Sequence, residues 1–182
     1  ALFGNNTELT IYAQYTEVGN FVVIYSAVGA DEETIPTDNT QYNIAETSII
    51  KIPNQEPKKL GYTFEGWKTG TDDTVYKYGT QNDTYTVPND INGAITFIAQ
   101  WSINEYEITY ELNGGINAEN APVSYTIETD TITLPVPTKD GYNFEGWYTD
   151  AAFENAVAAI AKGSVGDMVL YAKWSEKDMA VY

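Results

Sequence analysis

A seven-residue motif that occurs twice constrains the fold of this chain more than any other feature. GYTFEGW occupies residues 61–67 and returns as GYNFEGW at residues 141–147. The segments around it recur too: ITFIAQW ends at Trp101, MVLYAKW ends at Trp174, and FVVIY and YEITY open the two units. Self-similarity of this kind indicates a repeat protein in which each unit is one supersecondary module. We therefore predict two modules, over residues 17–102 and 103–175.

Partial copies of the repeat flank these modules. LTIYAQY, which ends at Tyr15, resembles the closing segments, so residues 1–16 are expected to be the closing strand of a preceding repeat. We expect this strand to be ordered, either docked on the first module or paired with another molecule, because its apolar side chains and open edge favour a partner. Residues 176–182 are expected to be a linker or the start of a next repeat. The chain reads as an internal segment of a longer array, with any export signal outside it.

Alternating apolar residues predict that the repeats are built from strands. Met168, Leu170, Ala172 and Trp174 would share one face of a half-buried strand. Asn113-Gly114-Gly115 is a turn signal because Asn and Gly tolerate positive φ. Residues 153–163 have helix propensity, but alignment on the closing Trp places Ile160 on Val87, so we predict extended structure with at most a short helical turn. Residues 75–88, where the first repeat is longer, are predicted to form an extended hairpin. The fold class is mainly β, or α+β at most.

Composition excludes several classes of function. The chain has 26 acidic and 9 basic residues, a formal net charge of −17, which argues against binding nucleic acid or anionic lipid. It contains neither Cys nor His, which removes disulfides, structural zinc sites and Cys or His nucleophiles. No apolar run reaches membrane-spanning length. We expect no cofactor, no metal and no membrane insertion of this segment.

The aromatic residues are the first candidates for a binding site, because sugars stack on flat rings. Trp67, Trp101, Trp147 and Trp174 recur at matching positions, which favours a core role over a sugar platform. Tyr76, Tyr78 and Tyr85 lie in the segment specific to the first repeat. They are the best candidates for a ligand surface, although ordinary strand packing is the preferred interpretation.

Carboxylates give no assignable site. Glu65 and Glu145 could in principle act as the acid–base pair of a glycosidase, but they lie in different modules, and acceptance of backbone hydrogen bonds at a turn is the preferred role. The pairs Asp72-Asp73, Asn82-Asp83 and Asn89-Asp90 lack the spacing of a calcium loop and are interpreted as solvated loops. We therefore assign no catalytic, cofactor-binding or metal-binding residues and predict that the chain is not an enzyme.

The GYxFEGW motif, the Asn-Gly-Gly turn and the closing LYAKW together resemble the Listeria–Bacteroides repeat, also called the internalin B-repeat type. The resemblance implies small β-grasp-like modules with little helix, arranged in tandem on secreted or wall-attached bacterial surface proteins. The first repeat departs from the pattern, with Ala27-Val28-Gly29-Ala30 in place of the Asn-Gly-Gly turn.

The expected function is a non-enzymatic spacer or stalk in an extracellular or surface-attached bacterial protein, with a possible role in adhesion. The expected partners are neighbouring repeats, with a glycan or host surface protein as further partners. The alternative function is a binding module for a glycan or a host protein.

Overall fold

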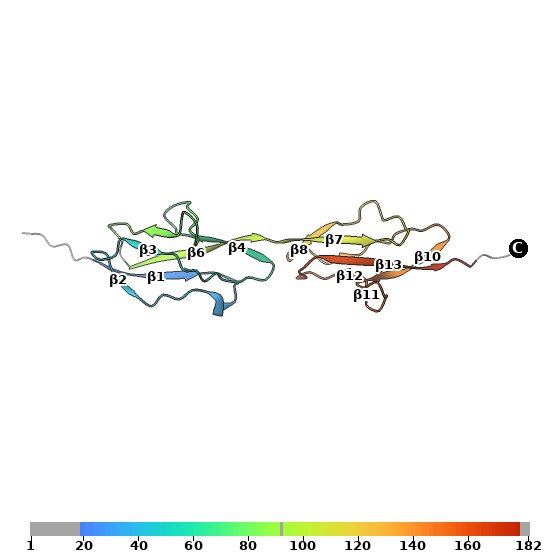
Figure 1. The fold of residues 1–182 in the computed structure, drawn as a ribbon, viewed down its shortest axis with the longest axis horizontal. Helices are drawn as coiled ribbons and strands as arrows, with labels where there is room; N and C mark the ends of the chain where they lie inside the picture. The colour runs from blue at the N-terminus through green and yellow to red at the C-terminus, as the bar shows by residue number, and fades with distance from the viewer. Residues whose placement is uncertain (1–18, 92, 179–182) are drawn as a thin grey trace, which may run out of the picture.

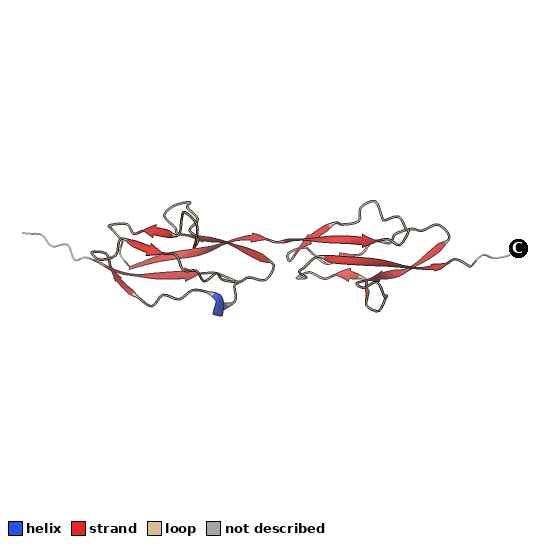
Figure 2. Cartoon of the chain, viewed as in Figure 1, coloured by secondary structure: helices blue, strands red, loops and turns tan. Residues whose placement is uncertain are grey.

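The computed structural model describes residues 19–91 and 93–178, which form two modules placed end to end along the long axis of the molecule (Figure 1). Nearly all regular structure is β-strand (Figure 2). One short 3₁₀ helix, η1 (Glu32–Thr34), interrupts the strands of the described residues. The mainly β fold with little helix, predicted from the alternating sequence, is confirmed.

The first module contains a mixed four-stranded sheet in the order β2-β1-β6-β4. Its strands are β1 (Asn20–Ser26), β2 (Gln41–Asn43), β4 (Tyr62–Lys68) and β6 (Gly93–Ile103). The opening strand β1 runs parallel to the closing strand β6, and the two outer strands are antiparallel to their neighbours. A second, two-stranded sheet pairs β3 (Ile49–Lys51) with β5 (Thr84–Thr86).

The second module repeats this architecture. Its main sheet has the order β11-β10-β13-β7-β8 and again pairs the opening strand in parallel with the closing strand. The strands are β7 (Glu105–Glu111), β8 (Ser124–Thr126), β10 (Tyr142–Tyr148), β11 (Ala156–Val157) and β13 (Met168–Glu176). The small sheet pairs β9 (Ile132–Thr133) with β12 (Ala159–Ile160). A β-grasp-like assignment of this mixed sheet stays a prediction.

Each module has its own hydrophobic core, built from the alternate positions that the sequence singled out. Ile95, Phe97 and Ala99 of β6 are buried, as are Leu170 and Ala172 of β13. Around β6 the first core gathers Phe21, Val23, Ala27, Ile50, Ile52, Phe64, Trp67, Tyr85 and Val87. Around β13 the second gathers Ile108, Tyr125, Leu134, Trp147 and Ile160. The predicted apolar face of the closing strand is confirmed.

The predicted turn at residues 113–115 is also confirmed. Asn113 and Gly114 both have positive φ, and the Gly115 amide donates to the Leu112 carbonyl at 2.9 Å. In the first module the Ala30 amide donates to the Ala27 carbonyl at 3.1 Å. The Ala-Val-Gly-Ala segment therefore makes an equivalent turn, although its sequence departs from the family pattern.

Residues 153–163 are extended and contain β11 (Ala156–Val157) and β12 (Ala159–Ile160). The prediction from the repeat is therefore confirmed, and the helix that propensity favoured is not formed. The residue equivalence behind that prediction was wrong. Ile160 lies opposite Ile132, as Tyr85 lies opposite Ile50, so Ile160 corresponds to Tyr85 and not to Val87. Counting back from the closing Trp assumes equal spacing in the two modules, but Trp101 lies 16 positions after Tyr85, whereas Trp174 lies 14 positions after Ile160.

The hairpin predicted over residues 75–88 was wrong. Its two arms pair with different partners, Tyr76 with Trp67 and β5 with β3. Near the tip, the Lys77 amide donates to the Asn82 carbonyl at 3.0 Å, and the Asn82 side-chain amide donates to the Val75 carbonyl at 3.4 Å. Each arm completes a different sheet of the module, which satisfies more backbone groups than local pairing would. The strand expected in residues 1–16 and the MAVY segment at 179–182 lie outside the described residues.

Candidate functional site

The four recurrent tryptophans divide into two pairs. Trp67 and Trp147 are buried, with exposed fractions of 0% and 3%, so their predicted core role is confirmed. Trp101 and Trp174 are half-buried at the rim of the sheets. Their rings meet those of Phe64 and Phe144 edge-on, at centroid distances of 5.5 and 5.4 Å. The rim tryptophans therefore belong to the edge of the core and also border the surface.

The three tyrosines considered as candidates for a ligand surface do not share one exposed face. Tyr85 is buried in the first core, 5.4 Å from the Phe97 ring. Tyr76 packs on that core, and its hydroxyl donates to Asp72 at 3.0 Å. Of the three, only Tyr78 is largely exposed. The structure thus supports strand packing for Tyr76 and Tyr85.

Glu65 and Glu145 lie within β4 and β10, at a bulge that both strands contain, and not at a turn as expected. Each carboxylate accepts a hydrogen bond of 2.5 Å from a serine hydroxyl of the closing strand, Ser102 or Ser175. The expected backbone acceptance at a turn was therefore wrong. These exposed side chains fasten the bulge to the neighbouring strand in each module.

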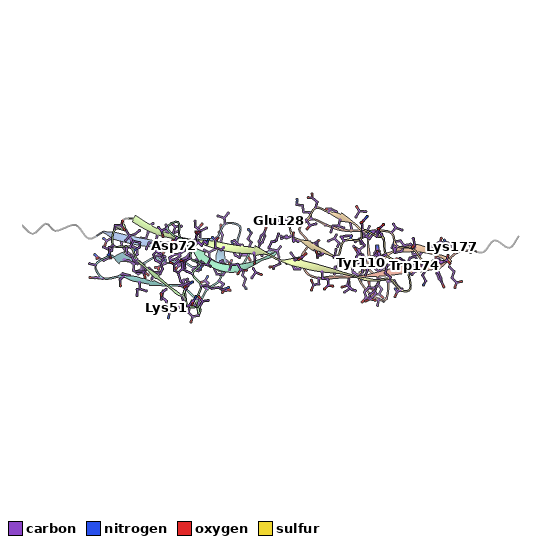
Figure 3. The ribbon with its side chains drawn as sticks, turned by 90° about the horizontal axis from the view of Figure 1, so that it is seen from above. Lys51, Asp72, Tyr110, Glu128, Trp174 and Lys177 are labelled. Carbon is purple, nitrogen blue, oxygen red and sulfur yellow. The ribbon has the colours of Figure 1, made fainter. Side chains whose placement is uncertain are left out.

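The acidic loops do not gather into a metal site. Asp72, labelled in Figure 3, accepts hydrogen bonds from the Thr74 amide and from the Tyr76 hydroxyl within its own loop. Asp73 makes an exposed ion pair with Lys68 at 3.4 Å. Across the described ranges, no three acidic, His or Cys side chains lie close enough together to hold a metal ion.

A lysine set against aromatic rings recurs in both modules, and the sequence analysis missed it. Lys59 Nζ lies 3.9 Å from the centre of the Tyr62 ring and 5.8 Å from that of Trp101. Lys139 Nζ lies 4.2 Å from Tyr142 and 5.9 Å from Trp174 in the same arrangement. Ammonium groups are attracted to the faces of aromatic rings at such distances. The signal was the Lys-x-Gly-Tyr sequence that opens both copies of the motif.

A single residue, Asn104, separates β6 of the first module from β7 of the second. Its amide donates to the Gly61 carbonyl at 2.9 Å, and its side chain accepts a 2.6 Å hydrogen bond from Thr63. The connection is therefore held to the first module through both its backbone and its side chain. Figure 1 shows the two strands following one another across the junction.

Direct contacts between the modules complete this junction. A β-carbon placed on Gly61 would lie 2.7 Å from Ile127, so the isoleucine packs directly on the glycine backbone. The Tyr62 hydroxyl donates to Glu128, which lies at the junction (Figure 3). This hydrogen bond, with smaller contributions from burial and from the negative charge, raises the pKa of Tyr62.

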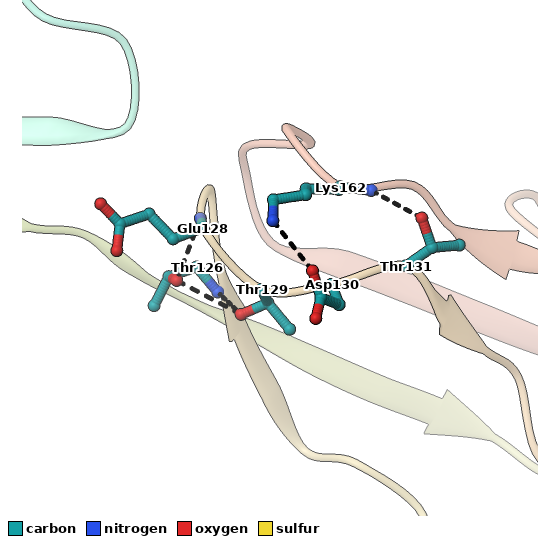
Figure 4. A network of polar contacts seen from close by, with 6 residues as sticks. All are labelled: Thr126, Glu128, Thr129, Asp130, Thr131 and Lys162. Atoms are coloured by element: carbon teal, nitrogen blue, oxygen red, sulfur yellow. Dashed lines mark hydrogen bonds and ion pairs between the residues drawn. The ribbon is translucent and has the colours of Figure 1, made fainter.

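Polar contacts within the second module shape the turn that carries Ile127 and Glu128 (Figure 4). The Thr126 amide donates to the Thr129 hydroxyl at 2.9 Å, and the Glu128 amide donates to the Thr126 hydroxyl at 3.3 Å. The Lys162 ammonium donates a hydrogen bond to the Asp130 carboxylate at 2.9 Å, and this contact lowers the pKa of Asp130. The turn is thus held by contacts within its own module as well as by those at the junction.

A surface groove runs beside the lysine–aromatic cluster of the second module. Its lining includes Lys139, Tyr142, Phe153, Lys173 and Trp174. The two lysines give this groove a positive character in a strongly acidic chain.

The family described as the Listeria-Bacteroides repeat domain matches residues 21–100 and 106–173. Two Evansella cellulosilytica proteins are similar to the chain. One, with the provisional name Gly-rich membrane protein, is 32% identical over 176 residues, which cover 94% of this chain and 19% of the relative. The other, provisionally named a membrane protein, is 29% identical over 174 residues, which cover 95% of this chain and 24% of the relative.

Internalin H of Listeria monocytogenes is 33% identical over 144 residues, covering 76% of the chain and 24% of the relative. The chain therefore spans between 19% and 24% of the length of these relatives. No solved structure matches it. In the part of the chain that the structure describes, no helix is both long enough and apolar enough to cross a membrane.

Proposed function

Because the chain belongs to the Listeria-Bacteroides repeat family, we propose that it is a non-enzymatic spacer or stalk segment of a bacterial cell-surface or secreted protein. The names of its relatives, two membrane proteins and an internalin, support an extracytoplasmic location. The proposed division is residues 17–102 and 103–175 as modules, with residues 1–16 as the closing strand of a preceding repeat and residues 176–182 as a linker or the start of a next one.

The junction at Asn104 is the observation that carries the proposal. A stalk has to hold its modules at a fixed separation, and a flexible linker would not do so. Here the modules share a one-residue connection, and Ile127 and Glu128 of the second module contact Gly61 and Tyr62 of the first. Bending would have to break these contacts together.

Distance measurements between spin labels test this stiffness. Since the chain contains no Cys, labels can be attached to Gln81→Cys in the first module and Glu154→Cys in the second, both exposed positions. We expect a narrow distance distribution. Inserting a short Gly-Ser segment after Asn104 should broaden it, because the junction contacts are then uncoupled from the chain connection.

The insertion variant is also the control, since it leaves both cores intact. A distribution in the unmodified chain as broad as that of the insertion variant would mean that the modules move independently, and the spacer proposal would fail.

A binding module for a glycan or host protein is the second candidate, favoured by the groove beside Lys139 and Trp174. The lysine already covers ring faces on which a sugar would stack, so an acidic ligand reaching the lysines fits this groove better than a neutral one. A glycan array comparing the unmodified chain with Lys139→Ala tests it. The binding function would be rejected if the unmodified chain captures no glycan, or if Lys139→Ala captures the same glycans equally well.

A further inference from the structure

We propose that the far end of the second module, formed by Lys139, Gly141 and Tyr142, is a docking surface for the turn of a following repeat of the same kind. That turn would seat an apolar side chain against Gly141, as Ile127 is seated against Gly61. The inference rests on the proposed stalk function and extends it from one junction to a repeated one.

The two module ends have the same backbone geometry. Gly61 and Gly141 have φ angles of 77° and 76°, a region that favours glycine. The Gly61 carbonyl accepts the Asn104 amide at 2.9 Å, and the Gly141 carbonyl accepts the Lys177 amide at the same distance. The chain therefore leaves the second module along the same path as it leaves the first.

The two ends differ in what covers them. Gly61 is buried and in contact with Ile127. Gly141 is exposed, and a β-carbon placed on it would have no neighbour within 4 Å among the residues that the structure describes. The surface that one module offers to its neighbour is thus present on the other module and open.

The occupant is identified by the turn that fills the first junction. Ile127 is half-buried yet lies outside the core cluster of its own module, so its burial serves the junction. The first module carries Ile44 at the matching position, directly after β2, as Ile127 directly follows β8, although Ile44 also packs against the core of its own module. An apolar residue at this point of the turn is therefore a feature of both repeats.

Charge also fits this occupant. Lys139 and Lys177 border the same groove at the open end (Figure 3 shows Lys177 there), in a chain with only 9 basic residues. The matching turns are acidic, with Glu128 in the second module and Glu46 in the first. Opposite charges across an interface favour its register and orientation.

The first experiment uses the chain as it stands and compares Gly61→Ala with Gly141→Ala. Because the two φ angles agree, backbone strain is nearly equal in both variants, and only Gly61→Ala meets Ile127. We expect Gly61→Ala to broaden the distance distribution between labels at 81 and 154, and Gly141→Ala to leave it unchanged. Equal effects of the two substitutions would overturn the role of glycine as the seat of the turn.

The second experiment adds a following module to the chain. Residues 1–177 are followed directly by a second copy of residues 105–178, which reproduces the spacing at Asn104, and the Glu154→Cys label is placed in the second and third modules. We expect a narrow distribution that Gly141→Ala broadens. Ile127→Ser in the added copy alone should broaden it as well, which keeps the test valid if Gly141→Ala fails to fold.

The outcomes separate the two proposals. A narrow first junction with a broad second one would overturn the docking surface and leave the stalk function standing. Broad distributions at both junctions would overturn the stalk function itself. A narrow second junction that neither substitution changes would show that the docking surface is not formed by Gly141.

Discussion

At the scale of single residues, Trp147 fills the centre of the second core. Its ring meets those of Tyr110 and Phe144 at centroid distances of 5.2 and 5.4 Å, and its indole N–H donates to the Pro135 carbonyl at 2.6 Å. The ring thus combines apolar burial with a satisfied polar atom, which is the usual condition for a buried tryptophan.

We predict that Trp147→Ala lowers the free energy of unfolding of the second module by about 3–5 kcal/mol, because it leaves a large cavity and an unpaired carbonyl. Urea unfolding followed by circular dichroism measures the loss. Tyr78→Ala, at a side chain that is 48% exposed, is the control and should change little. An unchanged midpoint for Trp147→Ala would contradict the buried position.

Asp150 organises the loop after β10. Its carboxylate accepts the amides of Glu154 and Asn155 at 3.1 and 2.8 Å, and these hydrogen bonds lower the pKa of Asp150. A carboxylate with a lowered pKa in the folded state stabilises the fold above its unfolded pKa of about 3.9 and loses this effect as the pH falls through the folded value.

We therefore expect the second module to lose stability below a pH of about 4, and Asp150→Asn to make this loss smaller while lowering stability at neutral pH. Thermal unfolding of the unmodified chain and of the variant, measured from neutral pH to below a pH of about 4, tests this expectation. Glu119→Gln, which removes an exposed charge outside this loop, is the matched control. If the melting temperatures of both variants depend on pH as that of the unmodified chain does, Asp150 does not stabilise the loop.

At the scale of elements, the turn after the opening strand of the second module contacts the rim tryptophan of that module directly. Trp174 donates its indole N–H to the Leu112 carbonyl at 2.9 Å. A β-carbon on Gly115 would collide with the Trp174 ring and lie 3.1 Å from the Thr138 carbonyl. The first module has Ala30 at this point of its turn, so the close approach is specific to the second.

Gly115→Ala should destabilise the second module by roughly 1–3 kcal/mol, because the added methyl group overpacks the site. Calorimetry of the full chain gives the size of the effect. Gly70→Ala serves as the control, since a β-carbon there meets nothing within 4 Å and the glycine lacks a positive φ. A stability equal to that of the control would show that the turn relaxes away from Trp174.

The strands could be predicted because the alternation of apolar residues is a local signal. The pairing of strands could not be predicted, because it depends on segments outside the strand itself. The alternation in residues 168–174 gives the buried face of β13 directly, and the repeat correctly overrode the helix propensity of residues 153–163. The hairpin at 75–88 failed because its two arms have different partners: Tyr76 pairs with the nearby Trp67, and β5 pairs with β3, which is remote in sequence. The junction was equally hidden, since no local pattern shows that Ile127 reaches Gly61.

At the scale of the whole molecule, we expect charge repulsion to outweigh ion pairing. The described residues contain three ion pairs, Lys68–Asp73, Lys77–Glu56 and Lys162–Asp130, each with a largely exposed carboxylate. Exposed pairs contribute little, while a net charge of −17 repels itself when the chain compacts.

Added salt should therefore raise the melting temperature modestly, because it screens repulsion over about 8–10 Å at physiological strength. Melting in low and moderate sodium chloride at neutral pH is the measurement, and sodium chloride titrated at constant buffer concentration is its control for buffer effects. A melting temperature that falls with salt would mean that attractive pairs dominate.

The parallel pairing of the opening and closing strands decides how each module responds to tension. In β1 and β6 the register runs from Phe21 opposite Gly93 to Ser26 opposite Ile98, so the chain enters the pair at one end and leaves it at the other. The same holds for β7 and β13. A pull on the two chain ends then shears the strands along their length, and the evenly spaced hydrogen bonds of a parallel pair resist together instead of opening one after another. An array of such modules would therefore resist stretching along its length.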